Sequence, residues 1–106
     1  MDDAIEMRRK LLLSVQRALL GAVPAALRAV TCGWEGTTIK LHFVFDGEIT
    51  SDDFEAAQVV ATEVIADFTA PWTIDEQIVR IDHPHKLRED KDRLALCAYL
   101  RRERRT

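Results

Sequence analysis

Two apolar segments joined by a short turn constrain the fold of this chain more than any other feature. Residues 26–34 and 37–46 are rich in apolar and β-branched residues that alternate along each segment. They flank Glu35-Gly36, a pair that suits a two-residue turn between antiparallel strands. The sequence therefore predicts a β-hairpin over residues 26–46.

The turn also predicts the register of this hairpin. Val30 is expected opposite Leu41, and Cys32 is expected opposite Ile39. Because side chains alternate between the two faces of a strand, all four lie on one face. That face is expected to cover the hydrophobic core.

An amphipathic segment before the hairpin predicts a first helix. Asp2 or Asp3 can cap its N-terminus, and the helix is expected to run to about Leu20. Gly21 suits a left-handed C-terminal position, and Pro24 prevents continuation. The expected core stripe consists of Ile5, Leu12, Val15 and Leu19, with Lys10 and Arg17 on the opposite side.

The clearest helix start follows the hairpin. Thr50 is placed to cap the helix, with Asp53 at the third helical position and Ile49 and Phe54 placed to form a hydrophobic staple. This second helix is expected to stop before Pro71. Its expected core stripe consists of Phe54, Ala57, Ala61, Val64, Ile65 and Phe68.

Two further strands are expected in the last third of the chain. Residues 74–82 are rich in Ile and Val. Residues 94–102 alternate like a strand but also have a helix-compatible composition; we favour a strand because residues 74–82 need an antiparallel partner. The prediction is a single α+β domain over residues 1–106, in the order α-β-β-α-β-β. A four-stranded, mainly antiparallel sheet would carry both helices on one face.

Nothing in the sequence predicts a membrane segment. No apolar run approaches the roughly 20 residues that a membrane-spanning helix needs. The N-terminal apolar stretch is broken by Gln16 and Arg17, which fits an amphipathic helix better than a signal peptide. We expect a cytoplasmic protein. Its two cysteines, Cys32 and Cys97, are expected to be reduced and buried as small apolar side chains.

Charge is distributed unevenly along the chain. Residues 41–76 hold nine acidic side chains and no Lys or Arg, whereas residues 86–106 hold eight basic and four acidic ones. Glu63 and Asp67 are like charges at a helical spacing of four, which is unfavourable for an isolated helix. One-signed surfaces attract oppositely charged partners. The alternative explanation is an ordinary hydrated helix face.

The basic C-terminal run is a weaker candidate for binding. Its four arginines could neutralise phosphates, but Glu103 interrupts them and the chain as a whole is acidic. The run consists of Arg101, Arg102, Arg104 and Arg105. We expect a hydrated terminus and no nucleic-acid partner.

Catalysis or metal binding has one candidate group of residues. His42, Asp46, His83 and His85 would have to converge in a pocket to serve a small metal- or nucleotide-handling enzyme. Neither cysteine lies in a motif with histidine, and the glycines form no phosphate-binding pattern. We expect no cofactor and no metal. A structural homodimer is a further alternative.

Four segments resemble immunity proteins of bacterial contact-dependent growth-inhibition and polymorphic-toxin systems. They are FVFDGEIT (43–50), EAAQVVATEVIADF (55–68), IVRIDHPHKL (78–87) and AYLRRE (98–103). The resemblance implies a non-catalytic inhibitor that binds a cognate toxin domain in the cytoplasm. Many such toxins are nucleases, whose basic active sites an acidic surface could cover.

The resemblance and the acidic segment together predict a binding surface on the second helix and the turn before it. The residues expected there are Asp46, Glu48, Asp52, Glu55, Val59, Glu63 and Asp67. Reversing Glu63 and Asp67 to Lys is expected to weaken toxin binding while leaving the fold intact.

Overall fold

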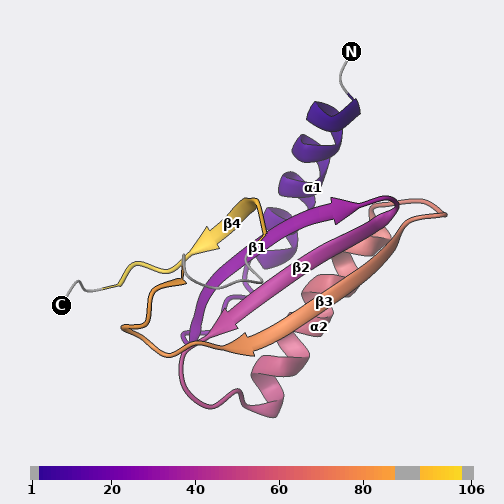
Figure 1. Ribbon diagram of the computed structural model, residues 1–106. Helices are drawn as coiled ribbons and strands as arrows, with labels where there is room; N and C mark the ends of the chain where they lie inside the picture. Colours follow the sequence, from indigo (N-terminus) through magenta and orange to yellow (C-terminus); the bar gives the residue numbers. More distant parts are fainter. Residues whose placement is uncertain (1–2, 88–93, 104–106) are drawn as a thin grey trace.

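The computed structural model describes residues 3–87 and 94–103 (Figure 1). Its elements are α1 (Asp3–Leu19), β1 (Leu27–Glu35), β2 (Thr38–Phe45), α2 (Ser51–Ala66), β3 (Thr73–Arg80) and β4 (Leu96–Leu100). The predicted α+β class and the order α-β-β-α-β-β are confirmed. Residues 94–102, ambiguous by pattern, contain a strand as expected.

The four strands form one sheet in the order β3-β2-β1-β4. β1 pairs antiparallel with both β2 and β4, so the sheet is mainly antiparallel as predicted. β3 instead runs parallel to β2. The expected antiparallel pairing of β3 with the last strand is therefore wrong. The crossover through α2 returns β3 to the edge beside β2 in a parallel direction, and β4 pairs at the other edge.

The hairpin register differs from the predicted one by two residues. Val30 lies opposite Phe43, and Cys32 lies opposite Leu41. The turn residues are Gly36 and Thr37, because Glu35 and Thr38 still pair. Gly36 has a φ of +60°, which suits the first central position of a tight hairpin turn. A shift of two residues preserves the faces, so the prediction of which side chains face the core is unaffected.

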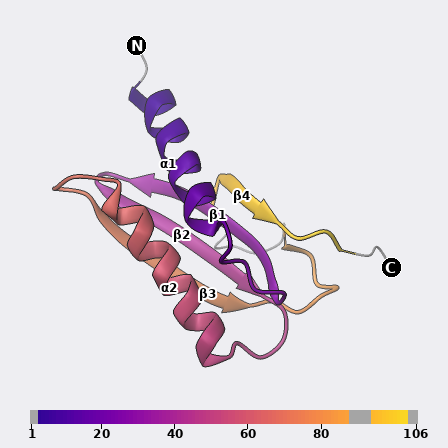
Figure 2. The same ribbon diagram turned by 180° about the vertical axis from the view of Figure 1, so that it is seen from behind.

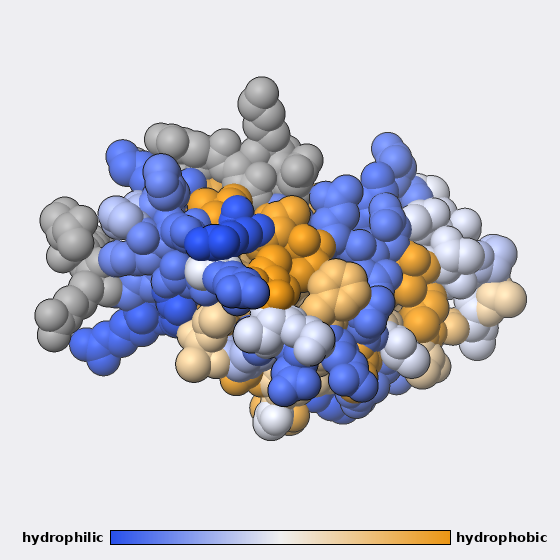
Figure 3. All heavy atoms as spheres, turned by 90° about the horizontal axis from the view of Figure 1, so that it is seen from below, coloured by the Kyte–Doolittle hydropathy of each residue, from blue (hydrophilic) through white to orange (hydrophobic). Residues whose placement is uncertain are grey.

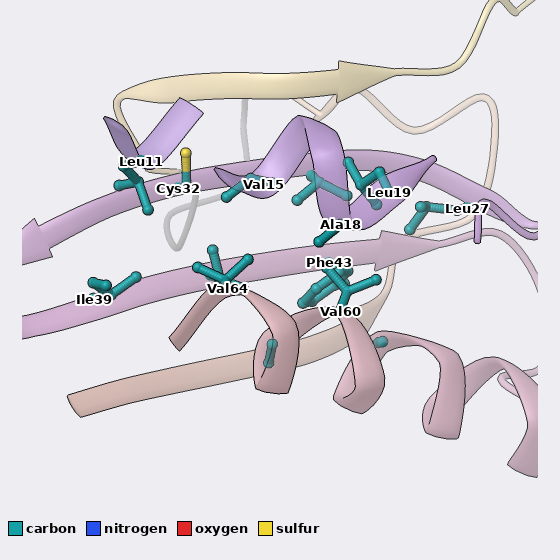
Figure 4. Close-up of a cluster of buried hydrophobic side chains, with 14 of the residues drawn as sticks. Leu11, Val15, Ala18, Leu19, Leu27, Cys32, Ile39, Phe43, Val60 and Val64 are labelled. Carbon is teal, nitrogen blue, oxygen red and sulfur yellow. The ribbon is translucent and has the colours of Figure 1, made fainter. Parts of the chain in front are cut away.

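Both helices cover the same face of the sheet (Figures 1 and 2). Figure 4 shows side chains of α1 and α2 directed at those of β1 and β2. The shared core contains Leu11, Val15, Leu19, Val30, Cys32, Leu41, Phe43, Val60 and Val64, among others. Burial of this apolar layer is the main source of stability expected for a domain of this size.

The predicted core stripes are partly wrong at the helix ends. Ile5 and Phe54 are 48% and 45% exposed, whereas Leu11 and Val60 are buried without having been expected. The first turns of α1 project past the sheet, and α2 begins beyond the strand ends (Figure 2). Apolar side chains at those positions have no sheet beneath them.

The two cysteines lie in different environments. Cys32 is fully buried, and burial raises the pKa of its thiol to about 12, with a smaller contribution from Cys97. Cys97 is exposed, so its predicted burial is wrong. β4 is an edge strand whose Leu96 and Ala98 pack on the core, and Cys97 between them therefore points away from the helices.

Across residues 3–87 and 94–103, no helix combines the length and the apolar character needed to cross a bilayer.

Candidate protein-binding surface

Helix α2 begins at a capped N-terminus that carries two acidic residues in its first turn. The Oγ1 atom of Thr50 accepts a hydrogen bond of 3.1 Å from the backbone N–H of Asp53, which confirms the predicted N-cap. Asp52 and Asp53 lie in the first turn, where carboxylates interact favourably with the helix dipole. The buried side of α2 consists of Ala57, Val60, Ala61 and Val64.

Four residues on the outward side form what we call the acidic ridge: Asp52, Glu55, Val59 and Glu63. Their spacing of three, four and four residues places them along one side of the helix. All four are exposed, and Val59 is 48% exposed. Within the described part of the chain, none of the three carboxylates forms an ion pair. The ridge therefore presents unneutralised negative charge around one apolar side chain.

Asp67, one turn beyond the ridge, is engaged inside the protein. The hydroxyl of Ser14 donates a hydrogen bond of 2.6 Å to its Oδ2 atom, and Arg17 pairs with the same oxygen. These contacts, led by that of Ser14, lower the pKa of Asp67. The expectation that Lys10 and Arg17 lie on the side of α1 opposite the core is wrong, because Arg17 contacts Asp67 and Lys10 contacts the Phe68 ring. Asp67 thus joins the two helices.

Asp46 is likewise engaged inside the protein. Arg101 donates a hydrogen bond of 2.9 Å to its Oδ2 atom, and the backbone N–H of His83 donates one of 3.2 Å to Oδ1. The bond from Arg101 is the main reason why the pKa of Asp46 is lowered. Glu48, two residues later, is exposed. Its charge contributes to raising the pKa of Arg80, although the hydrogen bond with Asp82 contributes most.

Arg101 belongs to a network that fastens the C-terminal segment, here called the C-terminal clasp: Arg28, Asp46, Arg101 and Glu103. The Arg28 side chain is only 3% exposed. Its Nε and Nη2 atoms donate to the two carboxylate oxygens of Glu103 at 2.7 and 2.8 Å, and Nη1 donates to the carbonyl of Ile81 at 2.7 Å. The pKa of Glu103 falls to about 2, mainly through Arg28. One arginine of the basic run is thus part of the fold. Arg104 and Arg105 lie outside the described residues.

The cavities that the described residues form beside His42 are not lined by the other candidate enzyme residues. His42 is buried on β2, His85 is exposed, and Asp46 accepts a hydrogen bond from the backbone N–H of His83. His42 lines one cavity of about 10 Å³ and another of about 140 Å³, and neither is lined by Asp46, His83 or His85. In the described part of the chain, no three His, Cys, Asp or Glu side chains are grouped so as to hold a metal.

The predicted surface therefore divides into two groups. Asp46 and Asp67 stabilise the fold, whereas the acidic ridge and Glu48 face solvent. In the view of Figure 3, hydrophobic residues form patches that hydrophilic side chains separate. Sequence reasoning did not find the pairing of Asp46 with Arg101, because 55 residues separate them.

Comparison with known proteins assigns the family. The family model described as "MafI2 immunity protein" matches residues 8–103, nearly the whole chain. A comparison with curated proteins gave no match. The resemblance noted in the sequence is confirmed, and the prediction of a non-catalytic protein is confirmed by the same match. The chain belongs to the MafI2 immunity protein family, whose members serve polymorphic toxin (Maf) systems by neutralising a cognate MafB toxin.

Proposed function

We propose that this chain neutralises its cognate MafB toxin by placing the acidic ridge of α2 on a basic surface of the toxin domain, inside the cytoplasm. The observation that carries the proposal is the exposure of Asp52, Glu55 and Glu63, which form no ion pair within the described residues. A carboxylate that is paired inside the protein would have to break that contact in order to bind a cationic partner. Among the described residues the ridge carboxylates have no such contact to break, so a cationic partner has to replace only their hydration.

A nuclease is the kind of toxin that this surface would suit. Nucleases attract a polyanion, so their active sites gather Lys, Arg and His side chains. At 1.5 Å per residue, the ridge from Asp52 to Glu63 extends about 17 Å along α2. Such a row of negative charge can imitate a short stretch of nucleic-acid backbone. Val59 lies among these charges and adds an apolar contact.

Charge reversal on the ridge tests the proposal. We expect Glu55→Lys with Glu63→Lys to weaken binding of the MafB toxin domain at least a hundredfold in titration calorimetry. The matched control compares Glu63→Lys with Asp75→Lys, since each reverses one exposed acid and Asp75 lies on β3, away from α2 and from the β1–β2 turn. Asp75→Lys is expected to shift affinity less than fivefold, and Glu63→Lys more than that. Equal losses in these two single variants would mean that net charge, and not the ridge, governs binding.

Asp67 is left unchanged in this design. Its bonds to Ser14 and Arg17 connect α1 with α2, so a reversal there would disturb the fold as well as the surface. Reversing Glu63 together with Asp67 would therefore not isolate the effect of the surface charge.

A further inference from the structure

A groove lies outside the acidic ridge, between the first turns of α1, the β1–β2 turn and the segment before β3. Its volume is about 510 Å³. It exists because α1 projects past the sheet (Figures 1 and 2), so the inner side of its first turns has no strand against it. Met7 is the one half-buried residue among residues 3–10, and it lines this groove.

Two tryptophans form the apolar part of the groove. Trp34 comes from the end of β1, and Trp72 comes from the segment after α2. Both are half-buried, and they are the two tryptophans of the whole chain. The Trp72 ring packs on Phe68 with 5.8 Å between ring centroids, which holds it in place. Partly exposed, positioned tryptophans are the residue type most often central to protein interfaces.

Two carboxylates lie beside these tryptophans. Asp3 and Glu6 line the groove one helical turn apart on α1, so their side chains are neighbours. Glu6 forms an ion pair of 3.3 Å with Arg9, and both side chains are more than 70% exposed. A hydrated ion pair of this kind contributes little stability, so the Glu6 carboxylate can leave Arg9 and bind another cation.

The groove also contains one cation that is already engaged. The Nζ atom of Lys10 lies 4.6 Å from the centroid of the Phe68 ring. This contact directs the ammonium group toward an aromatic face. The groove lining therefore carries two carboxylates, Asp3 and Glu6, against the single ammonium group of Lys10, which leaves an excess of negative charge.

We propose that this groove receives a long cationic side chain, Arg or Lys, from the cognate MafB toxin. The aliphatic stem would lie against Trp34 and Trp72, and the charged head would reach Asp3 and Glu6. The proposal rests on the proposed function, since it adds a second contact to the same toxin interface. The two surfaces are linked through the end of α2, where Phe68 packs on Trp72 next to Asp67.

Fluorine NMR gives a direct readout, because both tryptophans line the groove. Protein labelled with 5-fluorotryptophan has two resonances, and unlabelled MafB toxin domain is added to it. We expect both resonances to shift until one equivalent of toxin is present. If calorimetry shows a complex and both resonances stay in place, the groove is excluded while the proposed function stands. If no complex forms, both proposals fail.

Substitutions at the groove test its occupant. Ala4→Arg adds a bulky cation to the lining, and the matched control Gln16→Arg adds the same charge at an exposed position of α1 outside the groove. We expect Ala4→Arg to weaken toxin binding at least tenfold and Gln16→Arg less than twofold. Equal affinities would overturn the proposal.

A second pair of substitutions separates a cationic occupant from an apolar one. Asp3→Asn with Glu6→Gln removes both carboxylates and leaves the tryptophans. We expect binding to weaken at least fivefold. If the fluorine resonances of this variant still shift and its affinity is unchanged, the occupant is apolar and the cationic assignment is wrong.

Discussion

Arg28 at the start of β1 holds Glu103 near the C-terminus through two parallel hydrogen bonds of 2.7 and 2.8 Å. Arg28 is almost fully buried, so its charge depends on this partner for compensation. The two residues are 75 positions apart in the sequence, and their contact fastens the C-terminal segment to the sheet. Loss of the Glu103 carboxylate would leave the buried guanidinium of Arg28 bonded to the carbonyl of Ile81, with no carboxylate partner among the described residues.

We expect Glu103→Ala to lower the free energy of unfolding by about 3 kcal/mol, the cost of breaking a buried pair. Urea denaturation followed by circular dichroism measures this change. Arg102→Ala, at the exposed neighbouring position, is the control and is expected to change stability by less than about 0.5 kcal/mol. Similar losses in both variants would show that the clasp does not hold the segment.

Stability is expected to fall as the pH drops from about 4.5 toward 2. The pKa of Glu103 is lowered from 4.5 to about 2 in the folded protein, mainly by Arg28. A lowered pKa means that the stabilisation is complete above the unfolded value and is lost as pH falls through the folded value. Urea midpoints measured across this range should therefore converge for the wild type and Glu103→Ala. A constant difference between them would contradict the assignment.

Asp67 and Glu63 lie one turn apart and are expected to behave differently. Asp67→Asn should destabilise the protein, because it removes the charge that pairs with Arg17. Ser14→Ala, which removes a buried hydroxyl donor to the same carboxylate, is expected to cost about 1 kcal/mol. Glu63→Gln should leave the urea midpoint unchanged. If Glu63→Gln destabilised the protein as much as Asp67→Asn, the division of the acids into two groups would be wrong.

Toxin affinity is expected to depend on salt through the ridge carboxylates. Calorimetry from 50 to 500 mM NaCl should give a steep loss of affinity for the wild type and a shallower one for Glu55→Gln with Glu63→Gln. Val59→Ala should weaken binding without changing the salt dependence, because it removes apolar contact alone. A wild-type affinity that is independent of salt would exclude a charge-based interface.

The two thiols are expected to react at different rates. Cys97 is exposed and should react with a disulfide reagent in the native protein. Cys32 is fully buried, and burial raises its pKa to about 12, so it should react only after unfolding. One thiol equivalent is expected in buffer and two in denaturant, and Cys97→Ser should abolish the native reaction. Two equivalents in buffer would contradict this structure.

Local patterns predicted the elements well because their causes are local. Thr50 caps α2 as its sequence context indicated, and Gly21 has the positive φ expected after the first helix. The hairpin prediction failed by two residues of register, since Glu35-Gly36 and Gly36-Thr37 are both plausible turns and cross-strand packing decides between them. Of the candidate site, the exposure of the ridge was predicted from helical spacing, whereas the groove with Trp34 and Trp72 was not.

The sequence by itself determined the α+β class, the element order, the family and an acidic outward face on α2, since each depends on spacing or on neighbouring residues. Only the tertiary structure decided the strand order, the engagement of Asp46 and Asp67, and the groove beside α1. These features depend on contacts between residues far apart in the chain. Distance along a sequence carries no information about which charges will meet once the helices have packed on the sheet.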